Sequence, residues 1–142
     1  MIVLDTSVLS ELMRPSPSPD VVTWVRSQHS ATLYTTAVTV AEVRYGIAQL
    51  PDGRRKDQLG AVADDVFAAF PEHVLSFDAA AAVQYADLIA SRERAGAPID
   101  GFDAQIAAVC RVQDAALATG NGKDFAGADI ELVDPWRAST DR

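Results

Sequence analysis

The chain begins with the stretch MIVLDTS, residues 1–7, and this stretch decides the class of fold. Residues 1–4 are continuously apolar and include the β-branched Ile2 and Val3, and Asp5 ends the run. Continuous apolarity over so few residues predicts a short strand that is buried on both faces, as in a parallel sheet. The chain is therefore expected to supply helices that cover both faces of that sheet.

The rest of the sequence alternates between strand-like and helical segments. Further strands are expected at residues 32–36, 73–77, 115–118 and 130–133. Helices are expected at about residues 8–13, from 19 onward, at 39–50, 56–70 and 79–95, and within 96–110. Such alternation implies parallel strands that are joined by right-handed crossovers. We predict an α/β fold with three layers, α/β/α, around a central, mainly parallel sheet of about five strands.

Length and composition favour one globular domain. The chain has 142 residues, of which 49% are hydrophobic, and we assign residues 1–136 to a single domain and 137–142 to a short C-terminal tail. No apolar run reaches the ~20 residues of a membrane span, so we expect no membrane contact and a cytoplasmic location. The single cysteine, Cys110, excludes an internal disulfide and is expected in the core.

The net charge of −8 argues against broad non-specific binding to DNA or to anionic membranes. It does not exclude a nucleic acid whose phosphates meet metal cations in an acidic pocket. The positions of the carboxylates along the chain must therefore show whether such a pocket is expected. In open parallel sheets the working site lies beyond the carboxyl ends of the strands, which selects Asp5 and the loop that follows Ala118.

Three more acids fall near predicted helix starts. Glu42 lies beside the apolar face of the helix 39–50, where it either joins a site or forms a capping box with Thr39. Asp100 and Asp103 are three residues apart, so they share one end and roughly one side of a helix. Asp100 has the position of an N-cap. A capping role explains Asp103 less well, because it lies inside the first turn.

The loop after the fourth strand offers further oxygen atoms, from Thr119, Asn121 and Asp124, and is either an ordinary turn or part of a site. Several carboxylates cannot remain ionised side by side without a cation. A set of oxygen ligands suits Mg²⁺ or Mn²⁺ rather than zinc. Two such ions about 4 Å apart can activate water and stabilise the leaving oxygen of a phosphodiester. The acids therefore favour metal-assisted phosphodiester hydrolysis.

Five stretches give the chain a familiar pattern. In order, they are MIVLDTSVLSEL (1–12), TVAEVRYGIAQL (39–50), GAPIDGFDAQIAAVC (96–110), ATGNGKDF (118–125) and VDPW (133–136). With these stretches the chain resembles the PIN-domain ribonucleases, and most closely the VapC-type toxins of bacterial toxin–antitoxin pairs. Each motif is weak alone, but the ordered set is specific.

The resemblance implies a Mg²⁺- or Mn²⁺-dependent endoribonuclease of the PIN fold. Asp5, Glu42 and Asp103 match the acidic residues of the family that bind metal, and they are the expected metal ligands and catalytic residues. A fourth acid of the family stands either at the position of Asn121 or at that of Asp124. We expect Asp124 in the catalytic set; whether Asp124, Asn121 or Asp100 completes the metal site stays open.

Residues around the acids are expected to contact substrate or to orient the ligands: Thr6, Thr119 and Asn121. Ser7 stands where relatives often have asparagine, which alters a hydrogen bond of the site. Local cations for RNA are expected near the motifs at Arg14, Arg44 and Lys123. The densest basic run, residues 54–56, is interpreted as a solvated loop.

The resemblance also implies partners. Proteins of this kind are homodimers that a cognate antitoxin holds inactive, and they reach DNA only through the antitoxin. The alternative function is a catalytically silent PIN-like interaction module. A phosphatase with Asp5 as its nucleophile is disfavoured, because Ser7 stands where such enzymes carry a second aspartate.

Overall fold

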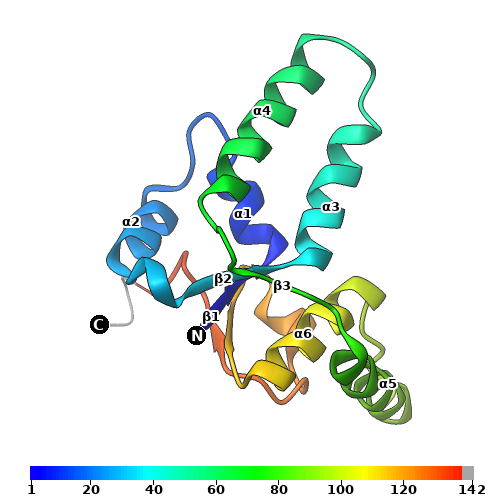
Figure 1. The fold of residues 1–142 in the computed structure, drawn as a ribbon. Helices are drawn as coiled ribbons and strands as arrows, with labels where there is room; N and C mark the ends of the chain where they lie inside the picture. Colours follow the sequence, from blue (N-terminus) through cyan, green and yellow to red (C-terminus); the bar gives the residue numbers. More distant parts are fainter. Residues whose placement is uncertain (139–142) are drawn as a thin grey trace.

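The computed structural model describes residues 1–138. The strands are β1 (Ile2–Leu4), β2 (Leu33–Thr36), β3 (Val74–Leu75), β4 (Ala116–Ala118) and β5 (Leu132–Val133). The α-helices are α1 (Thr6–Leu12), α2 (Pro19–Ser27), α3 (Ala37–Ala48), α4 (Arg54–Ala68), α5 (Ala79–Arg94) and α6 (Gly101–Gln113). Two 3-10 turns are added, η1 (Ser30–Thr32) and η2 (Gly122–Phe125). Figure 1 shows how these elements follow one another along the chain.

The sheet confirms the predicted class of fold. Its strand order is β3-β2-β1-β4-β5, and every neighbouring pair is parallel. The central strand β1 pairs with β2 through Ile2 and Leu33, and with β4 through Leu4 and Ala118. From the central β1, the strands β2 and β3 extend the sheet to one edge, and β4 and β5 extend it to the other. The direction of winding thus changes between β1 and β4, which is where ligands bind in open sheets of this kind.

Helices cover both faces of the sheet, which confirms the three predicted layers. Val3 packs in one cluster with Leu88 of α5 and Ile106 of α6. The next residue, Leu4, points to the opposite face and packs with Leu9 of α1 in a second cluster. This alternation follows from the two-residue period of a strand. Because both faces of β1 are covered, its continuous apolar sequence is explained.

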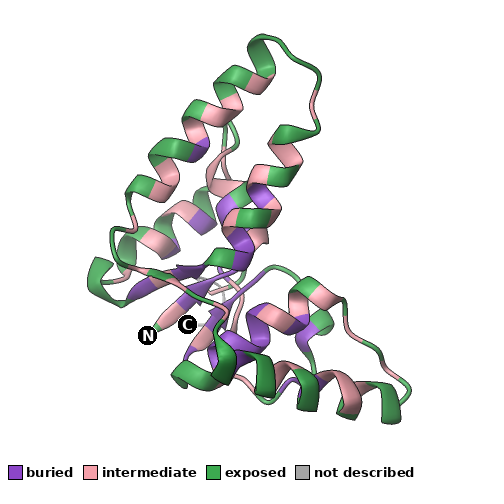
Figure 2. Cartoon of the chain, turned by 45° about the vertical axis from the view of Figure 1, so that its right-hand side comes forward, coloured by how far each residue is buried: buried purple, intermediate pink, exposed green. Residues whose placement is uncertain are grey.

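The helices α3 and α4 pack together and extend away from the sheet (Figure 1). Buried residues gather on the sheet and α6, whereas this helical arm is mostly exposed or half-buried (Figure 2). The basic run 54–56 was expected to be a loop, and that prediction is wrong, because it forms the first turn of α4. Gly53, with φ of 151°, permits the turn, and Lys56 Nζ donates to Ala48 O at 3.2 Å.

The end of the described chain lies against the sheet. Trp136 and Ala138 pack on the same cluster as Leu4. Of the predicted tail 137–142, residues 139–142 lie outside the described part of the chain. Within residues 1–138, none of the helices has the length and apolarity that crossing a membrane requires. The cytoplasmic location stays a prediction.

Candidate functional site

Asp5 lies where β1 ends, beside the end of β4. Its backbone N–H donates to Ala118 O at 2.9 Å, which extends the pairing of the two strands by one residue. Asp5 has the N-cap position of α1, but its side chain makes no capping hydrogen bond. Instead, Oδ2 accepts hydrogen bonds from Thr119 Oγ1 at 2.7 Å and from Ser7 Oγ at 3.0 Å. The carboxylate is 3% exposed and is held in one orientation by two hydroxyls.

The loop after β4 is tied back to α1 by its backbone. Gly120 N–H donates to Ser7 Oγ at 3.2 Å, and Asn121 N–H donates to Thr119 Oγ1 at 3.0 Å. Gly120 also packs on the indole of Trp136, where a β-carbon would lie 2.7 Å from Cζ3. Glycine is therefore required at this close approach. The motif VDPW thus contributes to the site by fixing the loop that orients Asp5.

Glu42 is held by a hydroxyl from α1. Thr6 Oγ1 donates to Glu42 Oε1 at 2.9 Å and lies 3.1 Å from Thr39 Oγ1. The capping box of Thr39 with Glu42 is a wrong prediction: the N-cap of α3 is Thr36, whose side chain accepts from Thr39 N at 3.0 Å. The strand β2 runs directly into α3, so the helix begins earlier than its apolar pattern indicates. Glu42 consequently lies in the second turn of α3, where the charge of Asp5 acts on it.

Asp100 and Asp103 separate into two roles at the start of α6. Asp100 is the N-cap, and its Oδ1 accepts from Phe102 N at 2.9 Å and from Asp103 N at 3.4 Å. The Asp103 side chain makes no hydrogen bond within the described residues and is half-buried. The helix behind it is anchored by the fully buried Ala104 and Ile106. The core therefore holds Asp103 at the carboxyl edge of the sheet.

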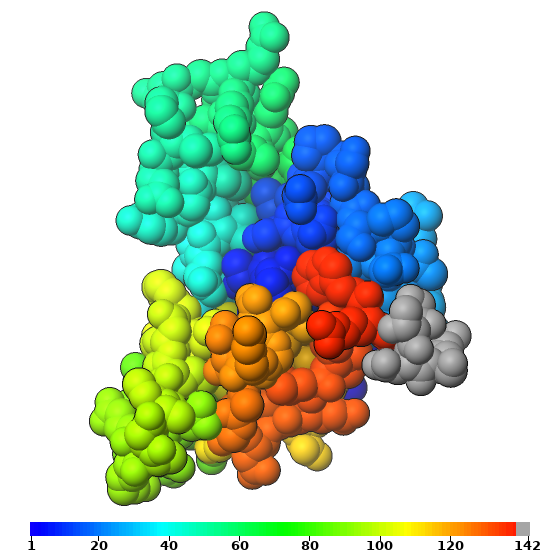
Figure 3. Space-filling view, turned by 180° about the vertical axis from the view of Figure 1, so that it is seen from behind, coloured from blue at the N-terminus to red at the C-terminus, as the bar shows by residue number. Residues whose placement is uncertain are grey.

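The electrostatics of Asp103 show that the acids form one group. The pKa of Asp103 is raised from 3.8 to about 7, first by burial and then by the charges of nearby acids, in the order Asp5, Asp100, Glu42 and Asp124. These acids come from the end of β1, from α3, from the start of α6 and from η2. From behind, the first residues, the segment near residue 100 and the segment near residue 120 meet at one place on the surface (Figure 3).

Glu42 belongs to the same group. Its pKa is raised mainly by burial, and the charges of Asp5 and Asp100 act in the same direction. The hydrogen bond from Thr6 opposes this by lowering the pKa. A carboxyl group in such surroundings is stabilised by a nearby cation, because a cation offsets both desolvation and repulsion.

The structure distinguishes the two positions of the fourth acid. Asp124, in η2, lines a cavity of about 270 Å³ together with Asp100 and Asp103. The side chain of Asn121 is exposed and makes no hydrogen bond within residues 1–138. Asp124 is itself exposed, and its charge has the smallest effect of the four that raise the pKa of Asp103.

The donor chemistry of the acidic group fits a hard cation. In the described part of the chain, no three carboxylate, imidazole or thiol groups stand close enough to hold one ion together. Mg²⁺ usually keeps several waters and binds through one or two carboxylates plus substrate phosphates, so a wider arrangement of acids suits it. His73 is engaged elsewhere, since its Nδ1 lies 2.8 Å from Leu33 O. The side chains of the acidic group itself offer only oxygen atoms as donors.

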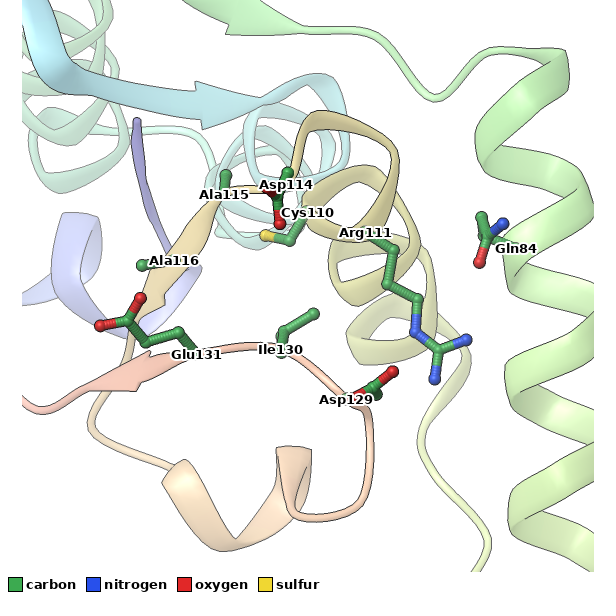
Figure 4. A pocket seen from close by; sticks show the side chains of 9 residues that line it. All are labelled: Gln84, Cys110, Arg111, Asp114, Ala115, Ala116, Asp129, Ile130 and Glu131. Carbon is green, nitrogen blue, oxygen red and sulfur yellow. The ribbon is translucent and has the colours of Figure 1, made fainter.

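A larger cavity, of about 490 Å³, lies at the opposite end of the sheet (Figure 4). It is lined by one residue of α5, by the end of α6, by the start of β4 and by residues before β5: Gln84, Cys110, Arg111, Asp114, Ala115, Ala116, Asp129, Ile130 and Glu131. Its three acids are exposed, and Arg111 Nε donates to Ala128 O at 2.7 Å. Cys110 is fully buried, as predicted. This cavity is separate from the predicted site residues.

One contributor, Thr39, was predicted only in a capping role, and another, Arg92, was missed in the sequence. Thr39 is fully buried and lies beside Thr6, three residues before Glu42, so helical spacing could have indicated it. Arg92, in α5, lines the cavity of Asp103 and Asp124. No local pattern indicates Arg92, because its position depends on how α5 packs on α6.

Comparison with known proteins agrees with the fold and the motifs. The PIN domain profile matches residues 2–131, and the chain belongs to the PIN-domain family. The chain is 38% identical over 137 residues to VapC ribonuclease Y4jK of Sinorhizobium fredii, which covers 96% of this chain and 98% of that protein. It is 35% identical to Toxin FitB of Neisseria gonorrhoeae, over 96% of this chain and 99% of FitB.

Solved structures give the same result. The structure of FitAB bound to a DNA fragment superposes with a TM-score of 0.88 at 35% identity, covering 96% of each chain. The resemblance to the PIN-domain family and to the VapC-type proteins within it, which the five motifs predicted, is confirmed.

Proposed function

We propose that the chain is a metal-dependent endoribonuclease toxin of a toxin–antitoxin pair, and that it hydrolyses phosphodiester bonds of RNA. One observation carries the proposal: Asp103 is half-buried among acids from four separate segments, and burial together with their charges raises its pKa to about 7. A fold gains nothing in stability from such a group, so its use lies in binding a cation. Supporting this, relatives of similar length are named VapC ribonuclease and Toxin FitB.

The proposed ligands of Mg²⁺ or Mn²⁺ are Asp5, Glu42 and Asp103, and Asp124 is the proposed fourth acid. When bound, the ion supplies Lewis acidity, which activates water and stabilises the charge that develops on the phosphate. Asp103 and Glu42 have raised pKa values, so the loss of their protons is linked to cation binding.

The chain's own residues fix the acids before substrate arrives. Thr119 and Ser7 hold Asp5 through one carboxylate oxygen, and within residues 1–138 no hydrogen bond reaches its Oδ1. Thr6 holds Glu42, and Asp100 begins the helix that carries Asp103. Such preorganisation lowers the cost of reaching the reactive geometry.

In the proposed reaction, the oxygen of water bonds to phosphorus and the bond between phosphorus and the 3′ oxygen breaks. The products are a 5′-phosphate end and a 3′-hydroxyl end. The test is incubation of the purified protein with cellular RNA and Mg²⁺, with and without EDTA, followed by sequencing of 5′-phosphate ends. New ends that need Mg²⁺ support the proposal. Ends with a 2′,3′-cyclic phosphate that form in EDTA contradict it.

The proposed partners are RNA as substrate, a cognate antitoxin and a second copy of the chain. The relative FitB provides support for an antitoxin, because FitAB was solved on DNA. A net charge of −8 fits DNA contacts that belong to the antitoxin and not to this chain. Light scattering of the chain with and without the product of the neighbouring gene tests both assemblies; a monomer in both samples would contradict them.

The exposure of Asp124 keeps a second candidate function, a catalytically silent PIN-like interaction module. This candidate predicts no saturable binding of Mn²⁺ at near-millimolar concentration, whereas the ribonuclease proposal requires it.

A further inference from the structure

We propose that Arg92 and Lys123 form a phosphate-binding subsite beside the acidic group. The subsite takes the backbone phosphate of RNA that neighbours the phosphate being cleaved. The inference rests on the proposed function for the identity of its ligand, and it adds a substrate contact that the acids themselves cannot make.

The first observation is an unsatisfied donor. Arg92 Nε is buried and has no hydrogen-bond partner within residues 1–138. In the same residues, the guanidinium group makes no ion pair. Buried donors are nearly always paired, because an unpaired donor loses its hydration without replacement. An acceptor from outside the chain would satisfy it.

The second observation is the way the fold seats this side chain. Gly127 has φ of 80°, and a β-carbon at this position would overlap Arg92 Nη1. Glycine is therefore favoured by the backbone conformation, and the absence of a β-carbon leaves the space that the guanidinium group occupies. The guanidinium group lies against the backbone of the loop after η2. The half-buried side chain thus packs beside Gly127.

The third observation is where the guanidinium lies. Arg92 and Lys123 line the cavity of about 270 Å³ that Asp100, Asp103 and Asp124 also line. Lys123 is exposed and, within the described residues, makes no ion pair. The basic side chains of Arg92 and Lys123 thus share one small cavity with two of the proposed catalytic acids, Asp103 and Asp124.

A backbone phosphate fits this arrangement better than an isolated carboxylate does. The planar fork of an arginine matches the oxygens of a carboxylate and of a phosphate alike, so the spacing of the charges decides between them. A polynucleotide repeats its charge at each nucleotide, so a strand with one phosphate at Asp103 presents the next phosphate to the adjoining cavity. The positive charges of Arg92 and Lys123 also offset the repulsion between that phosphate and the acids.

The test measures binding of a short, fluorescein-labelled single-stranded RNA by anisotropy. Every protein carries Asp103→Asn, so that the probe stays intact. In this background we expect Arg92→Gln to weaken the affinity about tenfold, because a charge-assisted hydrogen bond is lost. The slope of log K against log salt should fall in magnitude by about 0.7, the value for one phosphate contact on a single strand. Lys123→Gln should lower the slope in the same way.

The matched control is Arg94→Gln, which removes the same charge from an exposed position of the same helix. It should change the affinity less than about twofold and leave the slope unchanged. Arg92→Lys keeps the charge and loses the fork, so we expect the slope to be retained and the affinity to fall. Melting curves establish that each variant is folded, and exposed Lys123 provides a variant that cannot disturb the core.

Equal affinities and slopes for Arg92→Gln, Lys123→Gln and the background protein would overturn the subsite, even if the wild type cleaves RNA. An affinity for oligoglutamate that depends on Arg92, without one for RNA, would also overturn it and would assign the cavity to an acidic protein segment. Binding that depends on Arg92 in a chain whose wild type never cleaves RNA would support the subsite and reject the proposed function. The two proposals therefore fail separately.

Discussion

The amino and carboxyl ends of the sheet each carry a cavity lined by an arginine and three acids. At the amino end these residues are Arg111, Asp114, Asp129 and Glu131, and at the carboxyl end Arg92, Asp100, Asp103 and Asp124. The acids at the amino end are all exposed. At the carboxyl end Asp103 is half-buried and is joined by the buried Asp5 and by Glu42.

The arginines of the two cavities differ in whether their Nε atoms are hydrogen-bonded. Arg111 Nε donates to a backbone carbonyl at 2.7 Å, whereas Arg92 Nε has no partner within residues 1–138. The number of acids therefore does not distinguish the two ends. The two ends differ in burial and pairing. At the carboxyl end, acids repel one another in buried or half-buried positions, and a buried donor of Arg92 has no partner within residues 1–138, so a bound ligand would stabilise this end.

The largest expected effect comes from removing the central acid. Asp103→Asn should reduce RNA cleavage by at least about a hundredfold, because a proposed metal ligand is lost. Asp129→Asn is the matched change at the amino end, where asparagine tolerates the φ of 59°. It should leave cleavage unchanged. Similar activities of both variants on the same RNA would contradict the assignment of the active site to the carboxyl end of the sheet.

The second effect concerns the orientation of Asp5. Thr119→Val removes the 2.7 Å hydrogen bond to its carboxylate, and should lower the free energy of unfolding by about 2 kcal/mol and cleavage about tenfold. Thr35→Val is the control, because Thr35 is also fully buried but its hydroxyl donates to the neutral Leu4 O. It should cost about 1 kcal/mol in denaturant unfolding and spare cleavage. Equal losses of activity would contradict the role of Thr119.

The third effect is a dependence of stability on pH. Asp103 has a pKa near 7 when folded and an ordinary value of 3.8, so between these values the folded chain binds more protons than the unfolded chain. The free energy of unfolding should then fall as pH rises through this range in EDTA. Melting temperatures at about pH 5.5 and pH 8 measure it. Asp103→Asn should weaken the dependence on pH, and Asp129→Asn should preserve it. A wild-type protein that gains stability as the pH rises to 8 would contradict the raised pKa of Asp103.

The smallest effect is expected at the amino-end cavity. Burial raises the pKa of the Cys110 thiol to about 12, with a smaller contribution from Asp5, and the side chain is 0% exposed. A thiol reagent at pH 8 should therefore not react with the folded protein, and should react with one equivalent in guanidinium chloride. Rapid labelling of the folded chain would show that this cavity opens.

Much of the carboxyl-end site could be predicted because it depends on local rules. A buried strand that stops at Asp5 and a loop that follows Ala118 must meet at one edge if their strands are parallel and adjacent. The helix start at Asp100 likewise follows from capping chemistry. These features need only the sequence near each residue.

The remainder depends on how distant segments pack. Thr36, not Thr39, caps α3, because β2 leads straight into the helix, and the closely spaced Thr35, Thr36 and Thr39 leave the cap ambiguous in the sequence. Arg92 reaches the site only because α5 packs on α6 and Gly127 makes room for the guanidinium. No periodicity encodes either relation. Contacts of this kind exist only in the folded chain.

The most direct test of the acidic site is calorimetric titration of the chain with Mn²⁺ at about pH 6, in two buffers that differ in ionisation enthalpy. Because the pKa of Asp103 is near 7, binding should be saturable and should release close to one proton per ion. The release should disappear in Asp103→Asn and persist in Asp129→Asn. Absence of saturable binding at near-millimolar Mn²⁺, or equal binding by Asp103→Asn, would contradict the assignment of the carboxyl-end acids as a metal site.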